Sequence, residues 1–146
     1  MNTVAQILGS KPDQTVYTME PSASDHEAVR LMADENIGAL VVVEHEKIVG
    51  LVSERDYARK LVLMARSPTD TLLGDIMSSP VLYVRPHQTS DECMALMTEN
   101  RLRHLPVMDH GQLIGLVSIG DLVKATISEQ QFIIEQLEHY ITGQRD

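Results

Sequence analysis

The chain repeats itself at a fixed spacing, and this repeat constrains the fold more strongly than any local pattern. Gly-Leu-Val-Ser-Glu-Arg-Asp at 50–56 returns as Gly-Leu-Val-Ser-Ile-Gly-Asp at 115–121, and Pro21 and Pro86 lie the same 65 positions apart. The correspondence needs no gap from about residue 16 to about residue 60. An internal repeat of this length is typical of two similar structural units that stack on each other. Each repeat ends in the same Ser-x-x-Asp pair.

Composition narrows the classes of partner and compartment. The net charge of −9 argues against nucleic acid and anionic membranes as partners, because both require a basic surface. The single cysteine, Cys93, cannot form an internal disulfide, which favours a reducing compartment. The longest apolar runs have the length of strands, and no signal-peptide pattern opens the chain. We therefore expect a soluble, cytoplasmic α/β protein with an aliphatic core and no membrane segment.

Each repeat is predicted to contain a short strand, a helix, a two-stranded hairpin and a second helix, in that order. A Ser/Thr-x-x-Glu capping box begins the first helix of each repeat, at Ser24 and at Thr89. The predicted strands cover 16–19, 39–44 and 48–53 in the first repeat and 81–84, 104–109 and 113–118 in the second. The helices that follow the Ser-x-x-Asp pairs are predicted over 54–65 and 119–127.

Three further segments lie outside the repeats. Residues 3–8 and 72–77 are predicted to be short helices that lead into the two repeats. A separate C-terminal helix is predicted over 128–141, because Ser128 and Gln131 form another capping box, and its apolar face is expected to pack on the domain or on a second chain. The predicted domains are a lead-in helix at 1–15, repeats at 16–65 and 81–127, a linker with a short helix at 66–80, and a C-terminal helix and tail at 128–146.

The Ser-x-x-Asp pairs are the strongest candidates for binding chemistry. Ser53 and Ser118 are placed to cap the next helix, and Asp56 and Asp121 then fall in its first turn. A helix N-terminus favours a phosphate, and an ionised aspartate can accept hydrogen bonds from the two hydroxyls of a ribose. The pattern therefore indicates a binding site for a nucleoside phosphate. The alternative is that each pair is only a helix cap, with Ser at the N-cap and Asp three residues later.

The Arg-His-Leu-Pro-Val segment at 103–107, the doubled Gly-Leu-Val-Ser-x-x-Asp and the order of elements together resemble a tandem cystathionine-β-synthase (CBS) domain pair of the stand-alone bacterial type. The resemblance runs from about residue 3 to residue 124. It implies two β-α-β-β-α repeats related by a pseudo-two-fold axis, and a protein that associates as a homodimer. It also implies adenosine ligands in two clefts between the repeats: AMP first, with ADP, ATP, NAD(H) or S-adenosylmethionine as other members of the class.

The resemblance further implies that each cleft draws its Ser and Asp from one repeat and the walls around the adenine from the other. One cleft is expected to contain Ser118, Asp121, Thr18, Ala23, Ile37, Gly38 and Ala39. The other is expected to contain Ser53, Asp56, Tyr83, Gln88, Leu102, His104 and Pro106. The histidine of this second set is also compatible with a packed residue on a strand.

Charged side chains near the clefts are candidates for contacts with phosphate. Arg103 is the first candidate, and the weaker candidates are Arg55, Lys60 and Lys124. The last three are equally compatible with solvated charges on a helix face. The two clefts are expected to differ in ligand, because Gly120 opens space beside Asp121 whereas Arg55 adds a charge beside Asp56.

Other chemistries find less support in the sequence. His45 and His110 repeat, but they fall in the hairpin turns away from the serines, and no Gly-x-Ser-x-Gly elbow is present. No His or Cys spacing provides a metal site, and both common glycine-rich phosphate motifs are absent. Cys93 aligns with Ala28 on an apolar helix face and is predicted to be buried rather than redox-active.

We therefore predict a non-enzymatic module that senses an adenosine nucleotide and acts on an unidentified regulated protein, with no enzyme domain attached. A ligand that bridges the two repeats would shift their population toward one relative orientation. The alternative is a dimeric scaffold whose clefts bind no ligand. A third class, an enzyme that transfers phosphate from ATP, would consume its nucleotide.

Overall fold

In the computed structural model, which describes residues 2–142, the chain folds into two units that do not follow the order of the sequence. Residues 15–82 form the first-repeat unit, whereas residues 1–14 and 83–146 together form the second-repeat unit. The end of the predicted tail, residues 143–146, lies outside the described part of the chain. The N-terminal segment therefore packs with the second repeat, although it precedes the first.

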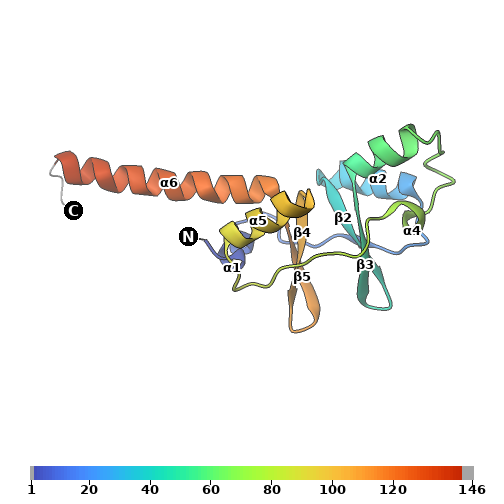
Figure 1. The fold of residues 1–146 in the computed structure, drawn as a ribbon, viewed down its shortest axis with the longest axis horizontal. Helices are drawn as coiled ribbons and strands as arrows, with labels where there is room; N and C mark the ends of the chain where they lie inside the picture. The colour runs from blue at the N-terminus through green and yellow to red at the C-terminus, as the bar shows by residue number, and fades with distance from the viewer. Residues whose placement is uncertain (1, 143–146) are drawn as a thin grey trace. The chain divides into compact units, whose positions relative to one another are not determined.

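The first-repeat unit places a three-stranded sheet beside short helices (Figure 1). Its elements are β1 (Thr18–Met19), α2 (Asp25–Glu35), β2 (Ala39–Glu44), β3 (Lys47–Ser53), α3 (Glu54–Asp56), the π-helix η1 (Tyr57–Val62) and α4 (Leu73–Ile76). β1 pairs with β2 in parallel, and β2 and β3 form an antiparallel hairpin. Met32 from α2, Leu40 from β2 and Leu61 from η1 are buried in one core.

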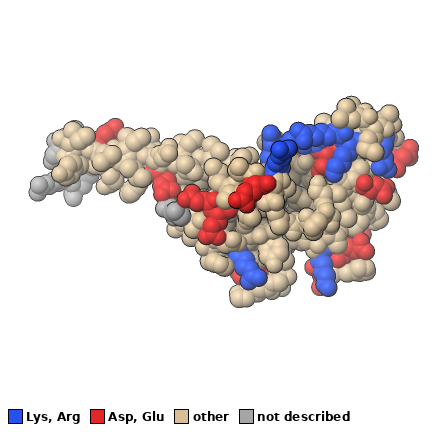
Figure 2. Space-filling view, in the orientation of Figure 1, with Lys and Arg blue, Asp and Glu red and all other residues tan. Residues whose placement is uncertain are grey.

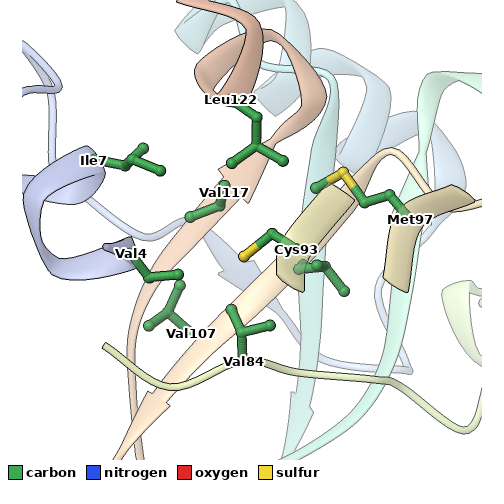
Figure 3. Packing of buried hydrophobic residues seen from close by; sticks show 9 residues of the cluster. Val4, Ile7, Val84, Cys93, Met97, Val107, Val117 and Leu122 are labelled. Carbon is green, nitrogen blue, oxygen red and sulfur yellow. The ribbon is translucent and has the colours of Figure 1, made fainter. Parts of the chain in front are cut away.

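The second-repeat unit is built around one antiparallel hairpin. Its elements are α1 (Val4–Gly9), α5 (Ser90–Asn100), β4 (His104–Asp109), β5 (Gln112–Ser118) and α6 (Ile119–Thr142). Val4 and Ile7 from α1 are buried together with Cys93 and Met97 from α5 and Leu122 from α6 (Figure 3). Cys93 is fully buried, which confirms the prediction, and this burial raises the pKa of its thiol. Because the thiol is both buried and protonated, it acts as a small apolar side chain.

The N-caps and hairpins predicted in the repeats are confirmed, whereas the second half of each predicted capping box, a bond from the N-cap N–H to the glutamate side chain, is shown for neither helix. Ser24 and Thr89 cap α2 and α5, and each accepts a hydrogen bond of 3.2 Å from the backbone N–H three residues later. Both hairpins lie where they are predicted, within one residue at each end. The two hairpin turns adopt the same left-handed conformation, with Gly111 at φ 77° in one and Glu46 at φ 65° in the other. The absence of glycine from the first turn therefore does not change its geometry.

The predictions for the first strand of each repeat are wrong in extent. β1 covers only Thr18–Met19, and of the run 81–84 only Val84 bridges to a strand. The Val84 N–H donates to Pro106 O at 2.9 Å, and Val84 O accepts from the N–H of Met108 at 2.9 Å. Tyr83, the preceding residue, is 48% exposed. A β-branched run predicts extended backbone, but tertiary contacts support pairing at only part of it.

Two predicted helices also differ from the structure. The segment 54–65 is not one α-helix, because α3 ends at Asp56 and η1 continues only to Val62. The helices predicted over 119–127 and 128–141 are one continuous helix, α6. No glycine or proline lies between Asp121 and Thr142, and Ser128 by itself does not interrupt the helical hydrogen bonds. Neither α6 nor any other helix in residues 2–142 is both long and apolar enough to span a membrane.

The two short lead-in helices each pack on the other repeat. α1 precedes the first repeat but belongs to the second-repeat unit, whereas α4 precedes the second repeat and belongs to the first-repeat unit. Leu8, in α1, lies over Gly115 of β5, and Met77, which follows α4, lies over Gly50 of β3. A Cβ on Gly115 would lie 2.7 Å from both methyl carbons of Leu8, so any larger residue there would force the end of the Leu8 side chain to shift.

Candidate functional site

The first Ser-x-x-Asp pair forms a reciprocal cap where β3 meets α3. The backbone N–H of Ser53 donates to Asp56 Oδ2 at 2.8 Å, and the N–H of Asp56 donates to Ser53 Oγ at 3.4 Å. Lys60 Nζ lies 3.1 Å from Asp56 Oδ1 and also donates to the carbonyl oxygen of Ile76. The carboxylate is therefore held by its own serine and by a lysine from the following turn.

The second pair has the same cap but a different lysine. The N–H of Ser118 donates to Asp121 Oδ2 at 2.8 Å, and the N–H of Asp121 donates to Ser118 Oγ at 3.1 Å. Lys11 Nζ lies 3.2 Å from Asp121 Oδ2 and donates to Leu116 O at 2.8 Å. Lys11 lies outside the repeats, so comparison of the two repeats gives no signal for it. Only the packing of α1 on the second-repeat unit brings it to this carboxylate.

Both carboxylates keep acceptor capacity beyond their caps. A carboxylate offers about four lone-pair positions. With the Ser53 hydroxyl, which donates to Asp56 Oδ2 at 3.3 Å, the contacts use three of them at Asp56 and two at Asp121. The side chains remain 14% and 21% exposed, respectively, so each reaches the surface. The helix-cap interpretation is therefore correct as far as it goes, and it leaves about two acceptor positions at Asp121 and about one at Asp56 for external donors.

Each unit also brings its own loop against its own Ser-x-x-Asp pair. Ala39 pairs with Ser53 in the hairpin, and the N–H of Glu54 donates to Gly38 O at 3.1 Å. In the second-repeat unit, His104 pairs with Ser118 in the same way. There the N–H of Ile119 donates to Arg103 O at 2.9 Å. The two cross-repeat sets given above stay predictions, because each unit is described by itself.

The remaining predicted residues fall into two groups by exposure. The side chains of Ala39 and Pro106 are buried in their strands, which leaves their backbone atoms as the groups available to a ligand. At least part of the surface is exposed at Thr18, Ala23, Ile37, Gly38, Arg55, Tyr83, Gln88, Leu102, Arg103 and Gly120. Gln88 already donates to Glu92 Oε2 at 3.1 Å and accepts from the N–H of Arg85 at 2.8 Å.

The imidazole of His104, next to the second pair, has a lowered pKa, which favours its neutral form. Its ring is partly buried at the start of β4, and this burial lowers its pKa. The nearby Asp121 carboxylate raises the pKa, whereas Lys11 and Arg103 lower it further. A neutral imidazole has one donor and one acceptor nitrogen, so His104 can hydrogen-bond a neutral ring or a hydroxyl group.

Asp25 is an unpaired carboxyl inside the first-repeat unit. Its side chain is fully buried at the first turn of α2, and within residues 2–142 neither carboxyl oxygen has a hydrogen-bond partner. Burial raises the pKa of this carboxyl above its usual 3.8, and the nearby Asp56 carboxylate raises it further, while His26 lowers it. The corresponding position of the second repeat is Ser90, which is also buried. The first repeat therefore buries a carboxyl group where the second buries a hydroxyl.

We expect Asp25→Ser to stabilise the chain at neutral pH by about 1–3 kcal/mol, the usual cost of a buried polar group without a partner. Because the folded chain holds this proton more tightly than the unfolded chain does, the free energy of unfolding falls as pH rises from about 3.8 through the raised pKa. Asp25→Ser should remove that slope, so its advantage should be smallest below pH 3.8, where the carboxyl is protonated in both the folded and the unfolded chain. Urea unfolding across the pH range measures both effects, with Glu27→Ser on the exposed face of α2 as the control. A lower stability of Asp25→Ser at neutral pH would refute this account.

A groove of about 680 Å³ opens beside Asp121, between α1 and α6. Its polar lining includes Lys11, Asp121 and Lys124, and its apolar lining includes Ile7 and Phe132. This volume lies in the range of small-molecule sites. The groove lies entirely in the second-repeat unit, and the sequence does not predict it, because it depends on α1 packing beside α6.

The comparisons with known proteins all point to the same family. A family model of the CBS domain matches residues 4–63 and 73–128, in two copies. The chain is 40% identical over 136 residues to the CBS domain-containing protein CBSX3, mitochondrial, of Arabidopsis thaliana. This match covers 90% of the chain, which spans 62% of the length of the plant protein.

Solved structures show the same likeness. A CBS-domain protein from Burkholderia ambifaria MC40-6 is 56% identical with a TM-score of 0.85, and the match covers 88% of this chain and 96% of that chain. The CBS domain pair of protein MJ0100, solved with 5-methylthioadenosine and S-adenosyl-L-methionine, is 24% identical with a TM-score of 0.77. The second match covers 88% of this chain and 98% of that chain, and it is a likeness of fold.

Proposed function

The chain belongs to the CBS domain family, with two copies of the domain, and from this premise we propose that it is a regulatory module that binds adenosine nucleotides. AMP is the first candidate, and ATP and NAD(H) are the next. The observation that carries the proposal is the doubled Ser-x-x-Asp pair, in which each carboxylate is held at a helix start with acceptor capacity left over. MJ0100, which binds two adenosine compounds on the same fold, supports this ligand class.

The ribose is the part of the ligand that the carboxylates recognise. Asp121 accepts hydrogen bonds from the two ribose hydroxyls of one nucleotide, and Asp56 does the same once the Ser53 hydroxyl turns away from Asp56 Oδ2, while the serine N–H fixes the orientation of each carboxylate. A deoxyribose offers only one of the two donors. The proposal therefore requires discrimination between AMP and 2′-deoxy-AMP, which a helix cap without a ligand would not produce.

The phosphate groups of the ligand are assigned to the positively charged side chains near each carboxylate. At Asp121, Lys11 and Lys124 both line the groove, and the long helix α6 begins there with the positive end of its dipole. At Asp56, Lys60 is the nearest cation, and α3 is only three residues long. The two sites therefore differ in phosphate affinity, which supports the expectation of inequivalent clefts.

The adenine is assigned to the opposite repeat in each case. For the Asp121 site the proposed contacts are Thr18, Ala23, Ile37, Gly38 and Ala39. For the Asp56 site they are Tyr83, Gln88, Leu102, His104 and Pro106. Neutral His104 can hydrogen-bond the uncharged ring edge, and exposed Tyr83 can stack on it.

A ligand held by both units would favour one arrangement of the repeats, and a regulated protein would bind that arrangement with a different affinity. The proposal as a whole is that the chain is a non-catalytic, cytoplasmic sensor that functions as a homodimer. A scaffold without a ligand is the alternative, and it accounts for the caps but not for the retained acceptor capacity of both carboxylates.

Thermal unfolding of nucleotide-free protein tests the proposal, with AMP, ATP, NADH, S-adenosylmethionine and 2′-deoxy-AMP as ligands. A ligand at about a hundred times its Kd adds roughly 2.7 kcal/mol, which raises the Tm by several degrees for a chain of this size. We expect AMP to raise the Tm and 2′-deoxy-AMP to raise it less. No shift with any ligand would favour the scaffold, and hydrolysis of ATP during incubation would favour an enzyme.

A further inference from the structure

The groove between α1 and α6 is polar at one end and apolar at the other. Lys11, Asp121 and Lys124 line it where α6 begins, whereas Phe132 and Ile133 line it further along the same helix. The distance along the helix axis from Lys124 to Phe132 is about 12 Å. The visible face of the outer part of α6 carries few charged side chains (Figure 2). The groove therefore has room for an elongated ligand whose two ends differ in polarity.

The polar end of the groove has positive charge that the fold does not use. Lys124 is exposed and forms no ion pair within the part of the chain that the structure describes. Lys11 Nζ contacts Asp121 and donates to a backbone carbonyl, which leaves one of its three donors. Glu129, which also lines the groove, accepts from Asn2 Nδ2 at 3.4 Å. The two lysines can therefore bind one anionic head group at the start of α6, where the helix dipole also favours it.

The apolar end of the groove is open to solvent. Phe132 and Ile133 are 61% and 51% exposed, whereas Ile7, which lines the groove from α1, is buried. A ligand tail that covers these side chains removes apolar surface from water, and each fully buried methylene group strengthens binding by about fourfold. The ligand that fits both ends therefore joins an anionic head to an apolar tail.

We propose that this groove is a separate binding site for a small organic anion with an unbranched apolar tail, the chemistry of a medium-chain fatty acid. The carboxylate of the ligand accepts hydrogen bonds from Lys124 and from the remaining donor of Lys11, and the tail lies along α6 over Phe132 and Ile133. Both walls of the groove extend beyond the repeats, into α1 and the second half of α6. The site is therefore specific to the second-repeat unit and is not a copy of a Ser-x-x-Asp site.

The groove adjoins the nucleotide site proposed above, because Lys11 and Asp121 belong to both. A carboxylate in the groove and a nucleotide phosphate beside Asp121 would share the same positive charge, so each ligand is expected to weaken the binding of the other. This coupling is reciprocal by thermodynamic linkage. The groove ligand needs no nucleotide, so its binding is tested on nucleotide-free protein and the result does not depend on whether AMP binds.

Isothermal titration calorimetry of the full chain tests the ligand class, with decanoate, octanoate, decanol and inorganic phosphate as probes. Decanoate is expected to bind at least about fourfold more tightly than octanoate, because its tail is two methylene groups longer. Decanol lacks the charge and should bind at least about tenfold more weakly than decanoate. Inorganic phosphate lacks the tail and should also bind more weakly. No binding of decanoate, or equal binding of decanol or phosphate, overturns the proposal.

Substitutions at exposed positions test the location of the site. Lys124→Gln is expected to remove the preference for decanoate over decanol, and Phe132→Ala to reduce the gain from octanoate to decanoate while AMP affinity stays unchanged. Lys47→Gln, at an exposed lysine of the first-repeat unit, is the control for charge. Ile134→Ala is the control for apolar surface, since Ile134 is 48% exposed on α6 and does not line the groove. Loss of decanoate binding in either control, or unchanged binding in Phe132→Ala, overturns the proposal.

Discussion

Alanine in place of both Asp56 and Asp121 is expected to lower the affinity for AMP by roughly tenfold to a hundredfold at each site, while the chain keeps its fold. Each carboxylate is held by its serine and a lysine, and it retains acceptor capacity for ribose hydroxyls. A hydrogen bond to a charged group contributes about 1.5–3 kcal/mol, which sets the range. Isothermal titration calorimetry on nucleotide-free protein measures the change.

The control for this prediction separates the loss of helix capping from the loss of hydrogen bonds to the ligand. Both substitutions remove the half of the reciprocal cap in which the aspartate accepts from the serine N–H, which by itself costs on the order of 1 kcal/mol of stability. Thr3→Ala removes a capping box of the same kind at α1, where Thr3 and Gln6 bond reciprocally and neither is proposed to contact a ligand. Thr3→Ala should therefore lower the Tm and leave AMP affinity unchanged. Wild-type affinity in the double aspartate variant would show that the Ser-x-x-Asp pairs are caps and nothing more.

Gly50→Ala is expected to destabilise the chain by about 1–3 kcal/mol, although it adds a single methyl group to a strand. A Cβ on Gly50 would overlap Met77 along most of its side chain, including its Cβ at 2.8 Å. The backbone at Ser78 is tied to Leu51 by two hydrogen bonds of 2.9 and 3.1 Å, so the segment cannot move away freely. Chemical denaturation followed by circular dichroism measures the loss.

Two further variants test whether the contact with Met77 causes this loss of stability. Gly9→Ala adds the same methyl group at a position where no atom of a packed neighbour lies within 4 Å, so it should be neutral or slightly stabilising. Met77→Ala in the Gly50→Ala background should recover part of the loss, giving a coupling free energy of about 1 kcal/mol or more. If the two changes were additive, the repeated glycine would need an explanation other than the close approach of the lead-in segment.

Much of the fold follows from short-range signals that are present in the sequence. Ser24 and Thr89 cap their helices because the cap needs only a side chain and the backbone three residues later. The hairpins follow from apolar runs bounded by a turn, and the repeat shows that both have the same form. The same signals place the two Ser-x-x-Asp pairs at strand-to-helix junctions, where the structure also has them.

The misplaced boundaries have a common cause. Ser128 and Gln131 match a capping box, yet α6 continues through them, because a cap motif ends or begins a helix only where the chain leaves the helical path. Val81–Val84 has strand composition, but only Val84 finds a partner on β4. In both cases the local pattern permits more than one structure, and packing selects between them.

The sequence by itself determined the two repeats, their caps and hairpins, and the carboxylates that the proposed site depends on. The tertiary structure alone decided that each lead-in helix packs on the other repeat, that Lys11 pairs with Asp121, and that Asp25 is buried without a partner. The first set depends on residues within a few positions of each other, which a pattern can show. The second set joins residues far apart in the chain, such as Lys11 and Asp121, through side-chain packing that no spacing encodes.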